Sequence, residues 1–185
     1  MKKISLIIIF FVFVVLSGCP ASAEMAPYYN SRSNLNSVAK TIAYKLDQNL
    51  IHMLNRSIPI LKTTLVNIDN MTKSSTLGRY LGDQIGIEFI KYGYKVRELR
   101  LRKDSVLMKK GGGEFALTRD VEEVVQNNEG QALIVGTYCP GSRYVDVSVR
   151  IVSAMDHSII SSCNVRIRRD KSVDALLEEN TYRES

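Results

Sequence analysis

The segment from Tyr144 to Val152 limits the possible folds of this chain more than any other part of its sequence. Apolar side chains occupy every second position, and polar or charged side chains stand between them. Because successive side chains of a strand point to opposite faces of a sheet, this alternation predicts a strand with one buried and one polar face. We place Val145, Val147, Val149 and Ile151 on the apolar face, and Tyr144, Asp146, Ser148 and Arg150 on the polar face.

Two further strand-like segments flank this one, from Ala132 to Tyr138 and from Ile159 to Arg168. The connecting turns, at Pro140-Gly141-Ser142 and Met155-Asp156-His157, are short, so consecutive strands are expected to pair as hairpins. In the last segment the expected core side chains are Ile159, Cys163, Val165 and Ile167, opposite Asn164, Arg166 and Arg168.

Helical spacing of apolar residues predicts a first helix from Leu35 to Leu54, capped at Ser33 or Asn34. After Pro59, the β-branched content of Leu61 to Asp69 predicts a buried strand. A second helix is expected from Leu77 to Tyr92, with Gly93 as a left-handed cap.

Tyr94 to Leu101 is expected to be a strand, and its Lys and Arg residues are typical of a sheet edge. Thr118 caps a predicted third helix that ends before Gly130, and a short helix is expected after Ser172. The predicted fold class is therefore α/β: a single-domain mixed sheet of about five strands, with about three helices packed on one face.

Three glycines, Gly78, Gly82 and Gly86, recur every fourth residue within the second helix. Each costs about 1 kcal/mol of helix propensity relative to alanine, so close packing must offset the loss. We favour a glycine stripe that lets the helix approach the sheet or the first helix, over an interface with a partner.

The N-terminus has the layout of an export signal. Lys2 and Lys3 precede an apolar run from Ile4 to Leu16, which at about 13 residues is too short to cross a bilayer as a helix. The run ends in Leu16-Ser17-Gly18-Cys19, which resembles the lipobox of bacterial lipoproteins. The resemblance implies that the signal is removed and that Cys19 carries the lipid. Pro20 follows, not the Asp of the enteric inner-membrane sorting rule, which favours the outer membrane.

The predicted organisation is a signal peptide over residues 1–18, a lipidated tether over 19–33, an α/β domain over 34–175 and a polar tail over 176–185. Loss of Lys2 and Lys3 lowers the formal charge from +6 to about +4. This mild excess of basic residues suits contact with anionic lipid or an acidic partner better than with nucleic acid.

Catalytic and metal-binding patterns are not evident. The two histidines, His52 and His157, have no Cys, Asp or Glu at metal-ligand spacing, and no nucleophile stands beside a base. We therefore expect a protein that is not an enzyme, with no metal and no cofactor. The expected partner-binding residues are Arg150, Arg166 and Arg168, because arginines on the polar sheet face suit carboxylate recognition.

Five sequence segments together resemble the FlgO family of flagellum-associated outer-membrane lipoproteins. They begin with Thr64 to Asn70, Ser75 to Arg79 and Gly93 to Arg100, and continue with Gly113 to Asp120 and Leu133 to Tyr138. The resemblance implies an accessory protein at the outer-membrane end of the flagellar basal body that supports flagellar stability or motility through protein contacts. It brings no catalytic residues.

Related α/β lipoproteins include activators of peptidoglycan synthases and subunits of the curli secretion channel. The channel is disfavoured because the hairpins of this chain are used in its core sheet. Activation of a peptidoglycan synthase, or another role in envelope assembly, remains the alternative, because it needs only a tether and a docking face.

Cys139 and Cys163 remain after lipidation of Cys19, and an oxidising periplasm permits a bridge between them. The predicted strand order places them two inter-strand spacings apart, roughly 9.6 Å. A disulfide needs Cα atoms within about 7 Å, so we predict two free thiols, with Cys163 buried and opposite about Arg150.

Overall fold

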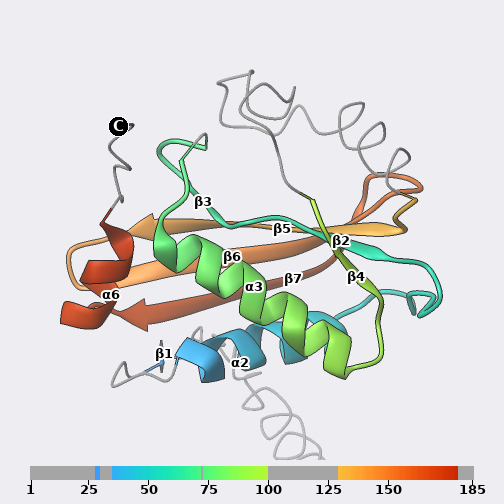
Figure 1. The fold of residues 1–185 in the computed structure, drawn as a ribbon, viewed down its shortest axis with the longest axis horizontal. Coiled ribbons are helices and arrows are strands. Elements are labelled where there is room, and N and C mark those ends of the chain that lie inside the picture. Colours follow the sequence, from blue (N-terminus) through green and yellow to red (C-terminus); the bar gives the residue numbers. More distant parts are fainter. Residues whose placement is uncertain (1–27, 30–34, 72, 100–128, 179–185) are drawn as a thin grey trace, which may run out of the picture.

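The computed structural model describes residues 28–29, 35–71, 73–99 and 129–178 (Figure 1). One mixed sheet of seven strands runs through this part of the chain, in the order β1-β7-β6-β5-β2-β4, with β3 also paired to β5. The long strands are β5 (Ala132–Pro140), β6 (Tyr144–Ser153) and β7 (Ile159–Arg168). The short ones are β1 (Tyr28–Tyr29), β2 (Ile60–Lys62), β3 (Val66–Asn67) and β4 (Val96–Glu98).

Three helices are described, α2 (Leu35–Gln48), α3 (Thr76–Lys91) and the short α6 (Lys171–Leu177), and all three lie on one side of the sheet (Figure 1). The predicted α/β class, with a mixed sheet and about three helices on one face, is confirmed. The helix expected from Thr118 lies outside the described residues, except for its C-terminal end near Gly130.

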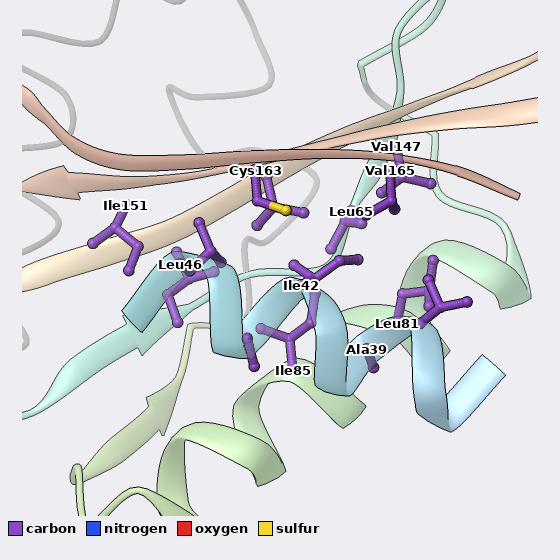
Figure 2. Close-up of a cluster of buried hydrophobic side chains, with 14 of the residues drawn as sticks. Ala39, Ile42, Leu46, Leu65, Leu81, Ile85, Val147, Ile151, Cys163 and Val165 are labelled. Atoms are coloured by element: carbon purple, nitrogen blue, oxygen red, sulfur yellow. The ribbon is translucent and has the colours of Figure 1, made fainter. Parts of the chain in front are cut away.

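The meander of β5, β6 and β7 is antiparallel and follows the predicted order, with β6 in the middle. Val145, Val147, Val149 and Ile151 are buried on the helix side, as their alternation predicted. Figure 2 shows how Ile42 and Leu46 of α2 and Ile85 of α3 approach Cys163 and Val165 from beneath the strands. These side chains are almost completely buried, so they form the main core.

The start of β7 differs from the prediction. Ile159, expected in the core, is about half exposed, whereas Ile160 is buried. A β-bulge causes this, because the register shifts between Ile151, which pairs with Ser161, and Val152, which pairs with Ile159. The extra residue in β7 moves the apolar position by one.

The first helix ends at Gln48, six residues before the predicted end at Leu54. Beyond it the chain turns onto β7: the Ile51 N–H donates to the Ile160 carbonyl (3.0 Å), and the Ser161 hydroxyl donates to the Leu46 carbonyl (2.7 Å). Met53 is therefore exposed, not part of a helix face.

The single strand predicted from Leu61 to Asp69 is split into β2 and β3, which both pair with β5 in parallel. In the gap, the Leu65 N–H donates to the carbonyl of Gly78 in the first turn of α3 (3.2 Å), not to a strand. The Ser74 hydroxyl donates to the Leu65 carbonyl (2.7 Å). The strand is interrupted because its polar backbone groups bond to the start of a helix.

The glycine stripe of α3 faces this interruption. Of the two neighbours that we predicted, the sheet and the first helix, the stripe therefore packs on the sheet side. A Cβ on Gly78 would clash with the Leu65 carbonyl oxygen, and one on Gly82 would lie 2.9 Å from the Thr63 carbonyl oxygen. At Gly86 the neighbour is the Lys62 side chain, at 2.7 Å. At Gly78 and Gly82 the helix therefore lies against the backbone, at a distance that larger residues would prevent.

The C-terminus of α3 ends as predicted. Gly93 has φ +87°, its N–H donates to the Ile90 carbonyl, and the Tyr94 N–H donates to the Phe89 carbonyl. This pair of bonds is a Schellman motif, and its usual apolar contact is the packing of Tyr94 on Phe89, with ring centroids 5.6 Å apart. The motif sends the chain into β4, which is the predicted edge strand.

Candidate functional site: the open face of the sheet

No helix of the described part of the chain covers the opposite side of β5, β6 and β7, which we call the open face (Figure 1). The residues that alternate with the core positions and are exposed or half-buried form this face, whereas Leu133 and Val135 on the same side of β5 are buried. The residues of the open face are Thr137, Cys139, Tyr144, Asp146, Ser148, Arg150, Ser162, Asn164, Arg166 and Arg168. All three arginines singled out from the sequence lie on the open face.

Arg166 is already engaged within the open face. It stands opposite Asp146 on β6, where its Nε donates to Oδ1 (2.7 Å), and its guanidinium lies 5.6 Å from the Tyr144 ring centroid. The hydrogen bond and the charge of Asp146 raise the pKa of Arg166 above its ordinary value. Sequence reasoning missed this pair, although both residues were placed on the polar face and the hairpin register would have brought them together.

Arg150 and Arg168 are exposed, and neither has an ion-pair partner among the described residues. Arg150 lies between Val135 and Ser162 on the neighbouring strands, whereas Arg168 stands opposite Tyr144. Arg150 lies six positions after Tyr144 in β6, about 20 Å away at the usual strand rise. The predicted arginines therefore form a line along the face, with Arg166 held by its own acid, not one compact carboxylate site.

The character of this side of the sheet changes toward β2. A second buried apolar cluster lies there, separate from the main core, and Leu133 at its centre pairs with Leu61 of β2 and Val152 of β6. Its fourth member, Val135, pairs with Arg150. Arg150 thus lies between a buried apolar cluster on the β2 side and the polar residues of the open face on the β7 side.

The two cysteines lie on opposite sides of the sheet and are both free. Cys139 pairs with Asp146 at the open face, whereas Cys163 pairs with Val149, one residue from the position expected. Burial raises the pKa of the Cys163 thiol, and the charge of Lys45 opposes this only in part. Cys163 is therefore a core side chain, and Cys139 is the accessible thiol of the two.

Other predicted positions are not assembled into a reactive site. Cys19 lies outside the described residues, His52 is exposed, and His157 adopts φ +59° in the β6–β7 turn. Within the ranges that the structure covers, no three His, Cys, Asp or Glu side chains are placed to hold a metal ion. Nor is any described helix long and apolar enough to cross a membrane.

A family model for the FlgO protein matches residues 40–172, more than half of the chain. The chain belongs to the FlgO family. The matched segment runs from within α2 through the whole β5–β7 meander to the start of α6, so both the helix-covered side and the open face belong to the family domain. No curated protein sequence is detectably similar to this FlgO family member.

Among solved structures, the fold is similar to the C-terminal domain of LpoB. The domain from Salmonella enterica aligns with a TM-score of 0.52 at 11% identity, covering 74% of this chain and 100% of that one. The domain from Escherichia coli aligns with a TM-score of 0.50 at 9% identity, with the same coverage. At such low identity, the likeness concerns the fold alone.

Proposed function

We propose that this FlgO family member is a non-enzymatic lipoprotein of the outer membrane that serves the flagellar basal body as an accessory protein. It supports flagellar stability or motility through protein contacts, with its domain in the periplasm. Membership of the family, over residues 40–172, is the observation that carries this proposal. A deletion strain tests it: we expect normal growth, reduced swimming and more frequent loss of flagella, restored by the wild-type gene.

The anchor in this proposal is the lipid on Cys19. A thiolate is the strong nucleophile in the Leu-Ser-Gly-Cys box, and several acyl chains, at about 0.8 kcal/mol per buried methylene, hold a protein to a membrane durably. Radiolabelled palmitate should enter the wild-type protein but not Cys19→Ala. Equal labelling of both would disprove the site, and Cys139→Ser is the matched control that should label normally.

The docking surface in this proposal is the open face, and the exposed guanidinium groups of Arg150 and Arg168 are its chemical signal. Of the three arginines, only Arg166 is paired with a carboxylate of the sheet itself, among the described residues. Arg150 and Arg168 can therefore form bidentate hydrogen bonds to carboxylates of an acidic partner surface. Arg150→Glu combined with Arg168→Glu should abolish co-purification with basal-body proteins. Lys40→Glu on the exposed side of α2 is the control, and retention of the partner by the double variant would exclude the open face.

The alternative is a lipoprotein activator of a peptidoglycan synthase, or another envelope-assembly factor. It requires the same tether and the same exposed docking face, so the fold suits it equally. A deletion strain separates the two functions. Normal motility combined with altered peptidoglycan cross-linking would replace the flagellar proposal with the synthase activator.

A further inference from the structure

Five exposed apolar side chains gather at the end of the sheet that carries the β6–β7 turn. Met155 is 92% exposed, and Ile51 and Met53 are each 77% exposed. We call this surface the apolar tip and define it as Ile51, Met53, Ile58, Met155 and Ile159. Single exposed apolar residues are ordinary on soluble proteins, whereas several of them on neighbouring loops are a candidate interaction site.

Hydrogen bonds hold the two loops of the apolar tip together. Besides the bond from Ile51 to Ile160 of β7, the Gln131 side chain accepts from the Asn55 N–H (2.8 Å) and donates to the Ile58 carbonyl (2.7 Å). The Gln131 carbonyl in turn accepts from the N–H of Ala154 in the β6–β7 turn (2.9 Å). Both loops lie at the same end of the sheet in Figure 1, opposite the end that carries α6.

The direction of β1 relates the apolar tip to the N-terminal tether. β1 runs parallel to β7, with Tyr28 opposite Arg166, so the chain enters β1 from the side of the tip. Arg166 lies seven positions after Ile159 in β7, about 23 Å away at the usual strand rise. Cys19 precedes Tyr28 by nine residues, which span at most about 30 Å. Acyl chains on Cys19 therefore have the reach to share one membrane surface with the tip.

We propose that the apolar tip rests on the phospholipid leaflet that holds the lipid of Cys19, and this rests on the proposed lipidation. Methionine and isoleucine side chains at the headgroup boundary gain apolar contacts there, and flexible methionines adapt to an irregular surface. Arg56 of the same loop is not counted among the lipid contacts, because its guanidinium lies over the Tyr94 ring, 5.5 Å from the centroid. The Asp156 carboxylate stays within the turn, because it accepts hydrogen bonds from the N–H and the hydroxyl of Ser158.

The experiment uses the full, lipidated protein in phosphatidylcholine–phosphatidylglycerol vesicles. In a Cys139→Ser background, single cysteines replace exposed His52 at the tip or exposed Ser142 in the β5–β6 turn, and each carries an environment-sensitive fluorophore. Cys163 is buried and stays unlabelled. We expect the fluorophore at position 52 to shift to the blue and to be quenched by lipid-attached quenchers, and the one at 142 to remain water-like.

Two double variants then assign the effect to the tip. Met53→Ser with Met155→Ser should reduce quenching at position 52 at least twofold, whereas Ile87→Ser with Ile90→Ser, at exposed positions of α3, should leave it unchanged. Water-like emission at position 52 in protein that still floats with the vesicles would overturn the proposal and leave the tip to a protein partner. Equal quenching at both positions would also overturn it. Failure of every variant to float would instead refute the lipid anchor, and this proposal with it.

Discussion

The helix-covered face and the open face belong to the same three strands, yet their side chains are constrained in different ways. On the covered side Val147, Val149 and Cys163 are buried against α2 and α3, where volume and shape decide which residues fit. On the open side Arg150 and Arg168 meet solvent, and only strand geometry restricts them. The comparison teaches that stability should depend on one face and partner recognition on the other.

The largest effect is expected where α3 meets backbone. Gly78→Leu places a side chain against the Leu65 carbonyl and within reach of the Tyr138 ring, so the helix must move away from β2 and β3. We expect a loss of about 4 kcal/mol or more in the free energy of unfolding, measured by urea denaturation. Gln84→Leu on the same helix is the control. A loss below about 1 kcal/mol would show that α3 does not need this close approach.

A smaller loss is expected from a cavity in the covered face. Leu46→Ala removes a fully buried side chain that packs beneath β7 (Figure 2), and should lower the free energy of unfolding by about 2–5 kcal/mol. Thr137→Ala, at a half-buried position of the open face, should cost less than about 1 kcal/mol. Equal losses for the two variants would remove the distinction between the faces.

A pH-dependent contribution is expected beside the covered face. Burial raises the pKa of Tyr94 above 10.0, and the hydrogen bond from its hydroxyl to Asp47 (2.8 Å) raises it further. The folded state therefore favours the neutral phenol, so this stability is complete below the unfolded pKa and is lost as pH rises through the folded value. Tyr94→Phe should flatten the fall of unfolding free energy above about pH 10. An unchanged slope of unfolding free energy at alkaline pH would show that Tyr94 is not the source of this dependence. Tyr92→Phe is measured in parallel, because burial also raises the pKa of Tyr92.

The smallest effect on stability is expected from Arg150→Glu. The side chain is exposed and has no ion-pair partner among the described residues, so the free energy of unfolding should change by less than about 0.5 kcal/mol. Thermal denaturation of the variant and the wild type under the same conditions measures this change in stability. A shift comparable with that of Leu46→Ala would mean that the open face contributes to folding and would weaken its assignment to partner binding.

Sequence patterns predicted those features of the fold that depend on residues close together in the chain. The alternation in β6 and the glycine at the end of α3 are local signals, so the strand faces and the left-handed φ of Gly93 followed from them. The split between β2 and β3 did not, because the carbonyl that draws Leu65 out of the strand belongs to Gly78, thirteen residues away. The bulge at Ile160 was not predicted either, since one inserted residue leaves the apolar composition of β7 unchanged.

The candidate site was predicted as a set of positions but not as an arrangement. All three arginines do lie on one face, because their parity along β6 and β7 determines it. Whether each arginine is paired with an acid depends on the strand register. Asp146 stands opposite Arg166, while Val135 and Ser162 stand opposite Arg150. The apolar tip was not predicted, since its loops become neighbours only through the hydrogen bonds of Gln131 and Ile160.

The sheet order also bears on the kinetics of folding. The β5–β6–β7 meander joins neighbouring segments through short turns, so its hairpins close small loops and form early. The pairing of Tyr28 with Arg166 must instead close a loop through nearly the whole domain. Only the two residues of β1 make strand contacts that offset the entropy of this closure. We therefore expect β1 to be the last strand to form and the first to detach. The amide hydrogens of the meander should exchange most slowly with solvent, and those of Tyr28 and Tyr29 should exchange fastest.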